Sequence, residues 1–235
     1  MVPHLSRGYN ELISAEKDAL IFTDANWTLF ASYLLQYGKG LFNDKKVIFS
    51  ALMLTPFSMN ELTEELGIPE FKDADPEFYK SKTPTMTFAN EMKKRIEHIA
   101  KYTKRPIYIS VSTNEAVKNL LKDHLYGEGL LMRYSSKPYD NLAVMRRNFE
   151  NTYLLDYLYE TFYPETLTDV CLDLKGVKML SIYYVPAFKS LLQFYKESGD
   201  VTHYDKLYSL LESIVKKADY YSDEVRERYL KSINF

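Results

Sequence analysis

Lys104-Arg105-Pro106-Ile107-Tyr108-Ile109-Ser110-Val111-Ser112 and Gly127-Glu128-Gly129-Leu130-Leu131-Met132-Arg133-Tyr134 are the two stretches that decide the fold. The apolar runs in them predict buried strands over residues 107–111 and 130–134. Between them, Ser112 and Glu115 have the spacing of a capping box that begins a helix. A strand, a helix and a parallel strand joined by tight turns form a right-handed crossover in nearly all proteins. We therefore expect these two strands to run parallel.

The sequence upstream repeats this alternation of strand and helix. Apolar runs over 19–23 and 46–50 predict two further strands, and helical periodicity fills 27–37 and 87–102. Such alternation is typical of a layered α/β domain with a mainly parallel sheet. We predict a Rossmann-like α/β domain over residues 1–136, with a mainly parallel four-stranded sheet.

The first predicted helix carries an aromatic stripe. Trp27, Phe30, Leu34 and Tyr37 fall on one face of it, and the pattern stops at Gly38, as in a helix that ends with a left-handed glycine. Aromatic stripes at helical spacing are usually core packing. We therefore expect this face to be buried.

Two further helices lie between the second and third predicted strands. Ser58 and Glu61 form a capping box that begins a short helix ending at Gly67. Residues 73–84 contain two prolines and mixed charges, which predicts a surface loop. The helix over 87–102 is amphipathic, and its apolar face consists of Phe88, Met92, Ile96 and Ile99.

The character of the sequence changes beyond Pro138. Residues 142–159, 182–197 and 203–220 show helical periodicity, and no convincing strand pattern follows. Residues 182–220 are similar to a tetratricopeptide hairpin, in which two antiparallel helices meet at a turn, here Gly199-Asp200. We therefore predict a helical, tetratricopeptide-like region over residues 137–235.

Composition excludes several classes of protein. The 30 basic and 32 acidic residues are mixed along the chain and give a net charge of −2, so nucleic acid is not expected as a partner. No apolar run approaches the ~20 residues that cross a bilayer. The single cysteine, Cys171, excludes an internal disulfide. The first residues lack a secretory leader pattern, so the chain is expected to be cytoplasmic or part of a longer protein, and we favour the second.

Polar side chains follow the predicted strands at their carboxyl ends, where open parallel sheets bind ligands. Hydroxyl, amide and carboxylate groups gather there, and caps or turns are the alternative role for such residues. We predict that any small polar ligand lies against Thr23, Asp24, Asn26, Ser110, Ser112 and Thr113.

No catalytic residue is predicted. The four histidines lie far apart in sequence, and neither a zinc-binding helix motif nor a nucleophile elbow is present. We therefore expect no metal and no cofactor.

Four segments together resemble a known family. Residues 22–36, 44–52, 104–112 and 127–134 resemble, in this order, segments of the soluble C-terminal part of bacterial multi-spanning membrane proteins of the protein O-mannosyltransferase-like, GT-C glycosyltransferase class. A closing helical pair in that family is similar to residues 182–220. The departure lies after the first strand, where Asn26-Trp27-Thr28-Leu29 replaces the family's Asp-Asn-Asp-Thr. Two carboxylates are therefore missing from this chain.

The resemblance implies a non-catalytic, extracytoplasmic (periplasmic) domain that recognises a glycan or an acceptor protein. The catalytic transmembrane part of such a protein would lie outside this chain and would connect it to the membrane. Two alternatives remain open. The first is a stand-alone α/β enzyme or nucleotide-sugar binder that uses the strand ends. The second is a helical-repeat protein-interaction module.

Overall fold

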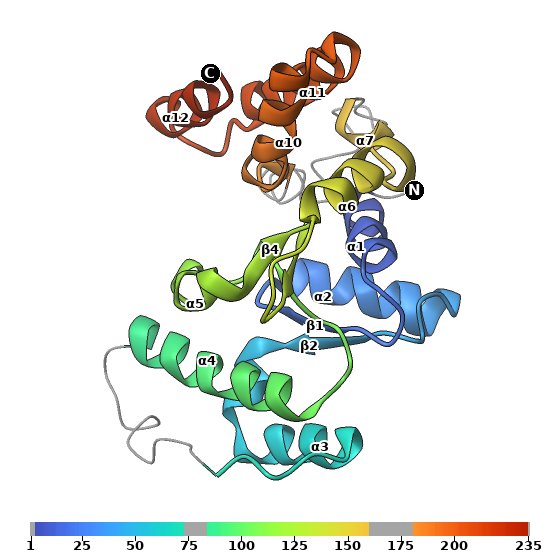
Figure 1. The fold of residues 1–235 in the computed structure, drawn as a ribbon, viewed down its shortest axis with the longest axis vertical. Coiled ribbons are helices and arrows are strands. Elements are labelled where there is room, and N and C mark those ends of the chain that lie inside the picture. The colour runs from blue at the N-terminus through green and yellow to red at the C-terminus, as the bar shows by residue number, and fades with distance from the viewer. Residues whose placement is uncertain (1–2, 73–83, 160–180, 235) are drawn as a thin grey trace, which may run out of the picture. The chain divides into compact units, whose positions relative to one another are not determined.

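The computed structural model describes residues 3–72, 84–159 and 181–234 (Figure 1). Most of the predicted loop over 73–84, as well as Cys171, lies outside the described residues. The chain forms two compact units: the sheet unit comprises residues 15–126 and 131–138, and the helical unit comprises residues 1–14, 127–130 and 139–235. The helical unit thus contains the N-terminal helix and a short segment from the middle of the chain, in addition to the predicted C-terminal region.

The sheet unit has a five-stranded mixed sheet, so the prediction of an α/β fold is confirmed at this level. Its strands lie in the order β2-β1-β3-β5-β4. β1 pairs in parallel with both β2 and β3. The strands are β1 (Leu20–Thr23), β2 (Lys46–Phe49), β3 (Ile107–Ser110), β4 (Leu125–Gly127) and β5 (Leu131–Tyr134).

The predicted direction of the fourth strand was wrong. β5 runs antiparallel to β3, with Ile107 opposite Tyr134 and Ser110 opposite Leu131. The cause is β4, a short strand that the sequence analysis did not predict. It lies next to β5 and is joined to it by residues 128–130 only, so the chain turns back in a tight loop instead of crossing over. A loop of this length cannot carry a chain to a parallel strand.

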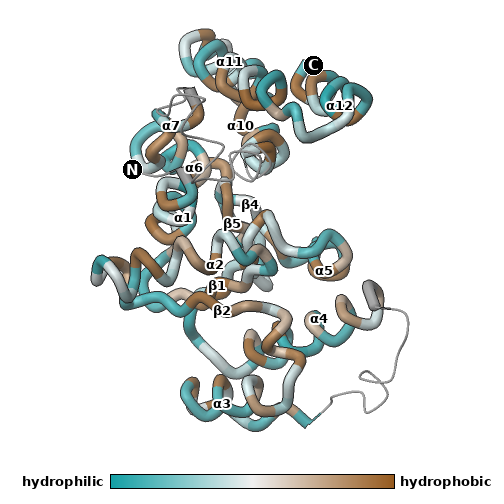
Figure 2. The backbone as a smooth tube through the Cα atoms, turned by 180° about the vertical axis from the view of Figure 1, so that it is seen from behind, coloured by the Kyte–Doolittle hydropathy of each residue, from teal (hydrophilic) through white to brown (hydrophobic). Residues whose placement is uncertain are grey.

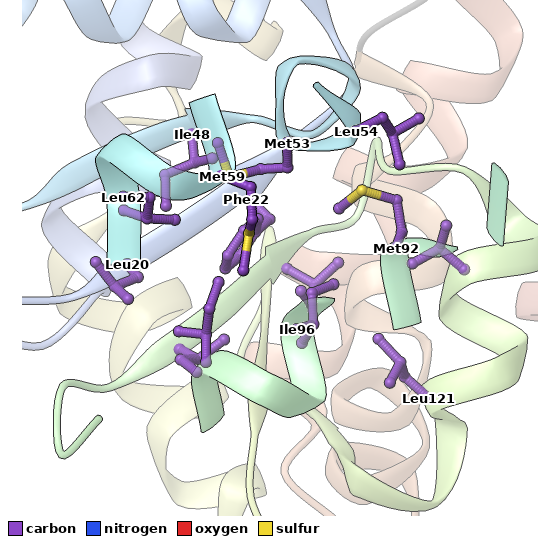
Figure 3. Packing of buried hydrophobic residues seen from close by; sticks show 14 of the residues in the cluster. Leu20, Phe22, Ile48, Met53, Leu54, Met59, Leu62, Met92, Ile96 and Leu121 are labelled. Carbon is purple, nitrogen blue, oxygen red and sulfur yellow. The ribbon is translucent and has the colours of Figure 1, made fainter. Parts of the chain in front are cut away.

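One face of the sheet packs against a hydrophobic core cluster (Figure 3). Phe22 and Ile48 project from β1 and β2 into a cluster of buried residues that includes Met59 and Met92. These methionines belong to α3 (Pro56–Leu66) and α4 (Pro84–Tyr102), which cover this face. Met92, Ile96 and Ile99 of α4 are fully buried, so the predicted apolar face of this helix is confirmed.

The aromatic stripe of the first helix does not face inward, contrary to our expectation. Trp27, Phe30, Leu34 and Tyr37 are 44, 64, 51 and 83% exposed. The residues of α2 (Asn26–Tyr33) and of the π-helical turn η1 (Leu34–Gly38) that are buried instead are Thr28, Leu29, Ala31, Ser32, Leu35 and Gln36.

The end of this helix also differs from the prediction. Gly38 lies inside the π-helical turn, and the left-handed glycine that follows is Gly40, with a φ of 67°. The Gln36 amide reaches across this turn and donates to the carbonyls of Phe42 and Lys45, at 2.9 and 2.8 Å. These hydrogen bonds hold the loop that leads into β2.

The other helix ends of the sheet unit are set by local capping. α3 ends at Gly67, as predicted, and this glycine has the left-handed conformation. The N-terminal cap of α3 is Thr55, whose hydroxyl accepts from the Ser58 amide, so the predicted capping box at Ser58 was wrong. α5 (Glu115–Leu121) is capped by Asn114 and not by Ser112.

The helical unit contains α1 (Pro3–Ser14), α6 (Asn141–Arg147), a π-helical turn η5 (Asn148–Thr152), α7 (Asp156–Tyr159), α10 (Tyr184–Ser198), α11 (Val201–Lys217) and α12 (Asp223–Ile233). α10 and α11 form the predicted hairpin, since Gly199 is left-handed and Asp200 caps α11. Buried Asn10 of α1 donates to the Leu154 carbonyl and accepts from its amide. The N-terminal helix is thereby joined to the segment between η5 and α7.

Gly129→Ala is expected to destabilise the helical unit. Gly129 has a φ of 113°, and a Cβ there would lie 2.6 Å from the Tyr153 hydroxyl, which accepts a hydrogen bond from the Leu130 amide. We expect a loss of about 2–4 kcal/mol in the free energy of unfolding, because backbone strain and a steric clash add together. Gly199→Ala is the control. Gly199 is also left-handed but has open space around it, so that variant should lose only about 1 kcal/mol in chemical denaturation. Equal losses would contradict the steric argument.

Candidate functional site

The predicted strand-end residues come together in part. β1 and β3 are adjacent parallel strands, so Thr23 and Asp24 lie at the same edge of the sheet as Ser110, Ser112 and Thr113. The Asp24 carboxylate joins the two strand ends directly, since its Oδ2 accepts from the Asn114 amide at 2.7 Å. Asn26, by contrast, is exposed as the first residue of α2, and no hydrogen bond of its side chain is found within the described residues.

Most polar groups at these strand ends bind one another. The Ser110 and Ser112 hydroxyls lie 2.8 Å apart. The Thr113 hydroxyl donates to the Phe22 carbonyl, and the Thr23 hydroxyl accepts from the Ala25 amide. In the described part of the chain, two buried side-chain atoms near this edge, Asp24 Oδ1 and the Thr28 hydroxyl of α2, have no hydrogen-bond partner. These residues therefore have a clear structural role, and their role as a ligand site stays a prediction.

A second candidate site is a pocket of about 990 Å³ at the outer edge of β2, entirely within the sheet unit. β2 forms its floor, because residues 45–49 all line it. α2 and α3 lie on opposite sides of this strand in both views of the backbone (Figures 1 and 2). η1 continues α2 along one wall with Tyr33 and Tyr37, and α3 forms the other wall with Glu61, Glu64 and Glu65.

The charges of this pocket are unevenly paired. Lys46 binds Glu65 with an Nζ–Oε2 distance of 2.5 Å, and Lys45 binds Asp44 at 2.9 Å. The hydrogen bond from Lys45 holds the pKa of Asp44 below its usual value. Glu61 and Glu64 are exposed, and neither has an ion pair within the described residues. The α3 wall therefore carries uncompensated negative charge.

The wall formed by the end of α2 and by η1 is aromatic. Tyr33 and Tyr37 pack edge to face, with their ring centroids 5.6 Å apart. Burial, followed by the neighbouring Tyr37, raises the pKa of Tyr33, so its hydroxyl stays protonated at neutral pH. Tyrosine rings beside carboxylates provide both apolar faces and hydrogen-bond acceptors, which suits a polar ligand with apolar surfaces.

Sequence reasoning missed this pocket. The sequence predicted a ligand site at the strand ends, where parallel sheets usually bind ligands. This pocket lies instead along the side of a strand. The signal in the sequence was the aromatic stripe that contains Tyr37, but such a stripe does not by itself show whether it faces the core or the solvent.

Comparison of the chain with protein-family models, with curated proteins and with solved structures found no match. Over the residues that the structure describes, no helix is long and apolar enough to cross a membrane. Within the same residues, no group of histidine, cysteine, aspartate and glutamate side chains could hold a metal ion.

Proposed function

We propose that this chain is a non-catalytic recognition domain of a membrane glycosyltransferase-like protein, on its extracytoplasmic side, and that it binds the acceptor of the sugar in the β2 pocket. The observation that carries the proposal is the open pocket itself, with a tyrosine wall and a carboxylate wall on either side of a strand edge. The proposal that the chain is part of a membrane glycosyltransferase-like protein rests on the resemblance of the four sequence segments alone. The same proposal includes a Rossmann-like domain over residues 1–136 and a tetratricopeptide-like region over residues 137–235.

The hydrogen bonds at the strand ends argue against the alternative of a nucleotide-sugar binder or enzyme that uses them. Such a site needs polar groups that are available to the ligand, and here Asp24, Ser110 and Ser112 already bind neighbouring groups. The pocket, by contrast, offers Glu61 and Glu64, which have no ion pair within the described residues.

The proposal is tested by mapping amide chemical shifts of the full chain during titration with oligosaccharides, with nucleotide sugars and with short unglycosylated peptides. We expect oligosaccharides or peptides to shift the amides of the pocket residues. Shifts confined to the strand ends would instead favour the nucleotide-sugar binder, and shifts confined to α10 and α11 would favour the interaction module.

Tyr37→Ala is expected to weaken binding of whichever probe shifts the pocket by about five- to tenfold, because an exposed ring that contacts the ligand is lost. Stability should change by less than about 0.5 kcal/mol, since the ring is 83% exposed. Tyr220→Ala is the matched control, because Tyr220 is also exposed but lies on the helical unit. Equal affinities of both variants and the unmodified chain, measured by the same titration, would argue against the pocket.

A further inference from the structure

The outer edge of β2 presents backbone groups that the sheet does not use. The Lys46 amide donates to the Ala19 carbonyl of the segment entering β1, at 2.9 Å. Successive residues of a strand direct their backbone groups to opposite sides, so Lys46 and Ile48 bind β1 while the Val47 and Phe49 amides point away from it. Among the described residues, no strand pairs with this side of β2.

The pocket lies along this edge. It is lined by the whole of β2 and by the preceding Lys45, and its two walls come from the helices that cover the two faces of the sheet. A groove of this form accommodates an extended chain in the plane of the sheet, with side chains directed alternately toward the two walls.

We propose that the β2 edge binds an extended polypeptide as an additional strand, and that this polypeptide carries lysine or arginine at alternate positions. This inference rests on the proposed recognition function and specifies the acceptor as a polypeptide. Main-chain hydrogen bonds to Val47 and Phe49 would provide affinity, and the walls would select the side chains.

The charge preference follows from the faces of the sheet. Lys46 and Ile48 project toward α3, since Lys46 binds Glu65 and Ile48 lies in the core cluster with Met59. Side chains of an added strand on this face therefore meet Glu61 and Glu64, whose charges are uncompensated within the described residues. Side chains on the other face meet Tyr33 and Tyr37, which suits apolar residues.

The groove also has defined ends. At the start of β2, the Gln36 amide already occupies the Lys45 carbonyl, at 2.8 Å. At its end, the chain leaves the strand at Ser50, where the 3-10 helix η2 (Ser50–Leu54) begins. The added strand therefore matches β2 in length.

The test uses the full chain and a short capped peptide of alternating lysine and valine. Hydrogen exchange is measured at the Val47 and Phe49 amides with saturating peptide. We expect exchange at these two amides to slow about tenfold or more, since each becomes hydrogen-bonded in a strand ladder. The Ile48 amide, which already binds β1, serves as the internal control. Unchanged exchange at Val47 and Phe49 would overturn the proposal.

Methylated peptides provide a second readout. The backbone nitrogens of one peptide are methylated at the lysines, and those of another at the valines. Only one of these sets faces β2 in a given orientation, so one peptide should lose about tenfold or more in affinity while the other keeps it. Equal effects of the two methylations would contradict strand addition.

Charge selection is tested with the double variant Glu61→Gln and Glu64→Gln, which should weaken binding of the lysine peptide about three- to tenfold and reduce its dependence on salt. Asp123→Asn, at an exposed acid outside the pocket, should leave binding unchanged.

The choice of probe distinguishes the two proposals. If oligosaccharides shift the pocket amides and no peptide does, strand addition is overturned and the recognition function still stands. If neither probe shifts them, both proposals fail.

Discussion

Replacing Phe22 by alanine is expected to lower the free energy of unfolding of the sheet unit by about 3–5 kcal/mol. Phe22 is fully buried in β1, which lies between β2 and β3, and it projects into the core between α3 and α4 (Figure 3). Truncation removes apolar contact and leaves a cavity that the surrounding helices close only in part. Trp27 is the one tryptophan of the chain, so its fluorescence during denaturation reports on this unit.

The control is Phe57→Ala. Phe57 lies on α3 but is 71% exposed, so its loss should change stability by less than about 0.5 kcal/mol. A Phe22→Ala variant as stable as this control would mean that the described core does not hold the unit together.

Glu91→Leu should be comparably destabilising, by about 3–5 kcal/mol, because it leaves a buried cation without its partner. The Glu91 and Arg95 side chains are each 2% exposed and bind each other with an Oε2–Nη1 distance of 2.5 Å. The Arg95 guanidinium also lies over the Phe71 ring, 4.8 Å from its centroid. Adding Arg95→Met should restore most of the stability, because it removes the unpaired charge. A double variant as unstable as Glu91→Leu alone would contradict this explanation.

The same ion pair predicts a dependence of stability on pH. Burial raises the pKa of Glu91, but the hydrogen bonds from Lys94 and Arg95 outweigh it and leave the pKa below its usual 4.5. A carboxylate with a lowered pKa in the folded state contributes stability above the unfolded pKa, and the contribution is lost as pH falls through the folded pKa. Denaturation between neutral pH and about pH 3 should therefore show a flatter pH dependence for Glu91→Leu than for the unmodified chain.

The pocket is a better target for functional experiments than the strand ends. The sequence directs attention to the strand ends, yet Asp24 there connects β1 to the start of α5 through the Asn114 amide. Variants at Asp24 would therefore disturb the sheet unit as well as any ligand. Tyr37, Glu61 and Glu64 are exposed side chains of the pocket, so changes there separate binding from folding more cleanly.

Local sequence was sufficient to predict the strands and helix ends that depend only on nearby residues. The strands at β1, β2, β3 and β5 were predicted within a residue or two of their observed bounds, because short apolar runs bounded by polar residues suit buried strands. Helix ends at Gly67 and Gly199 were also predicted, since glycine adopts a left-handed conformation without the steric cost of a side chain.

The direction of β5 and the exposed face of α2 depend on tertiary structure. A strand pattern is the same whichever way the chain runs, and only the pairing with β3 and the unpredicted β4 sets the direction of β5. The helix from α2 into η1 has apolar residues on both sides, so periodicity alone does not tell whether Leu29 and Leu35 or Trp27 and Tyr37 face the sheet.

The pocket lies beyond sequence reasoning for a related reason. Its floor is β2, and its walls are the end of α2 with η1 on one side and α3 on the other. These elements follow one another in sequence, but the groove between them stays open because β2 is the edge strand of the sheet. Strand order is decided by competition among all pairings of the folded chain, and no local pattern encodes it. The sequence by itself determined the positions of β1, β2, β3 and β5 and of the longer helices, while the packing of those elements decided the direction of β5, the buried face of α2 and which edge and side chains remain open to a partner.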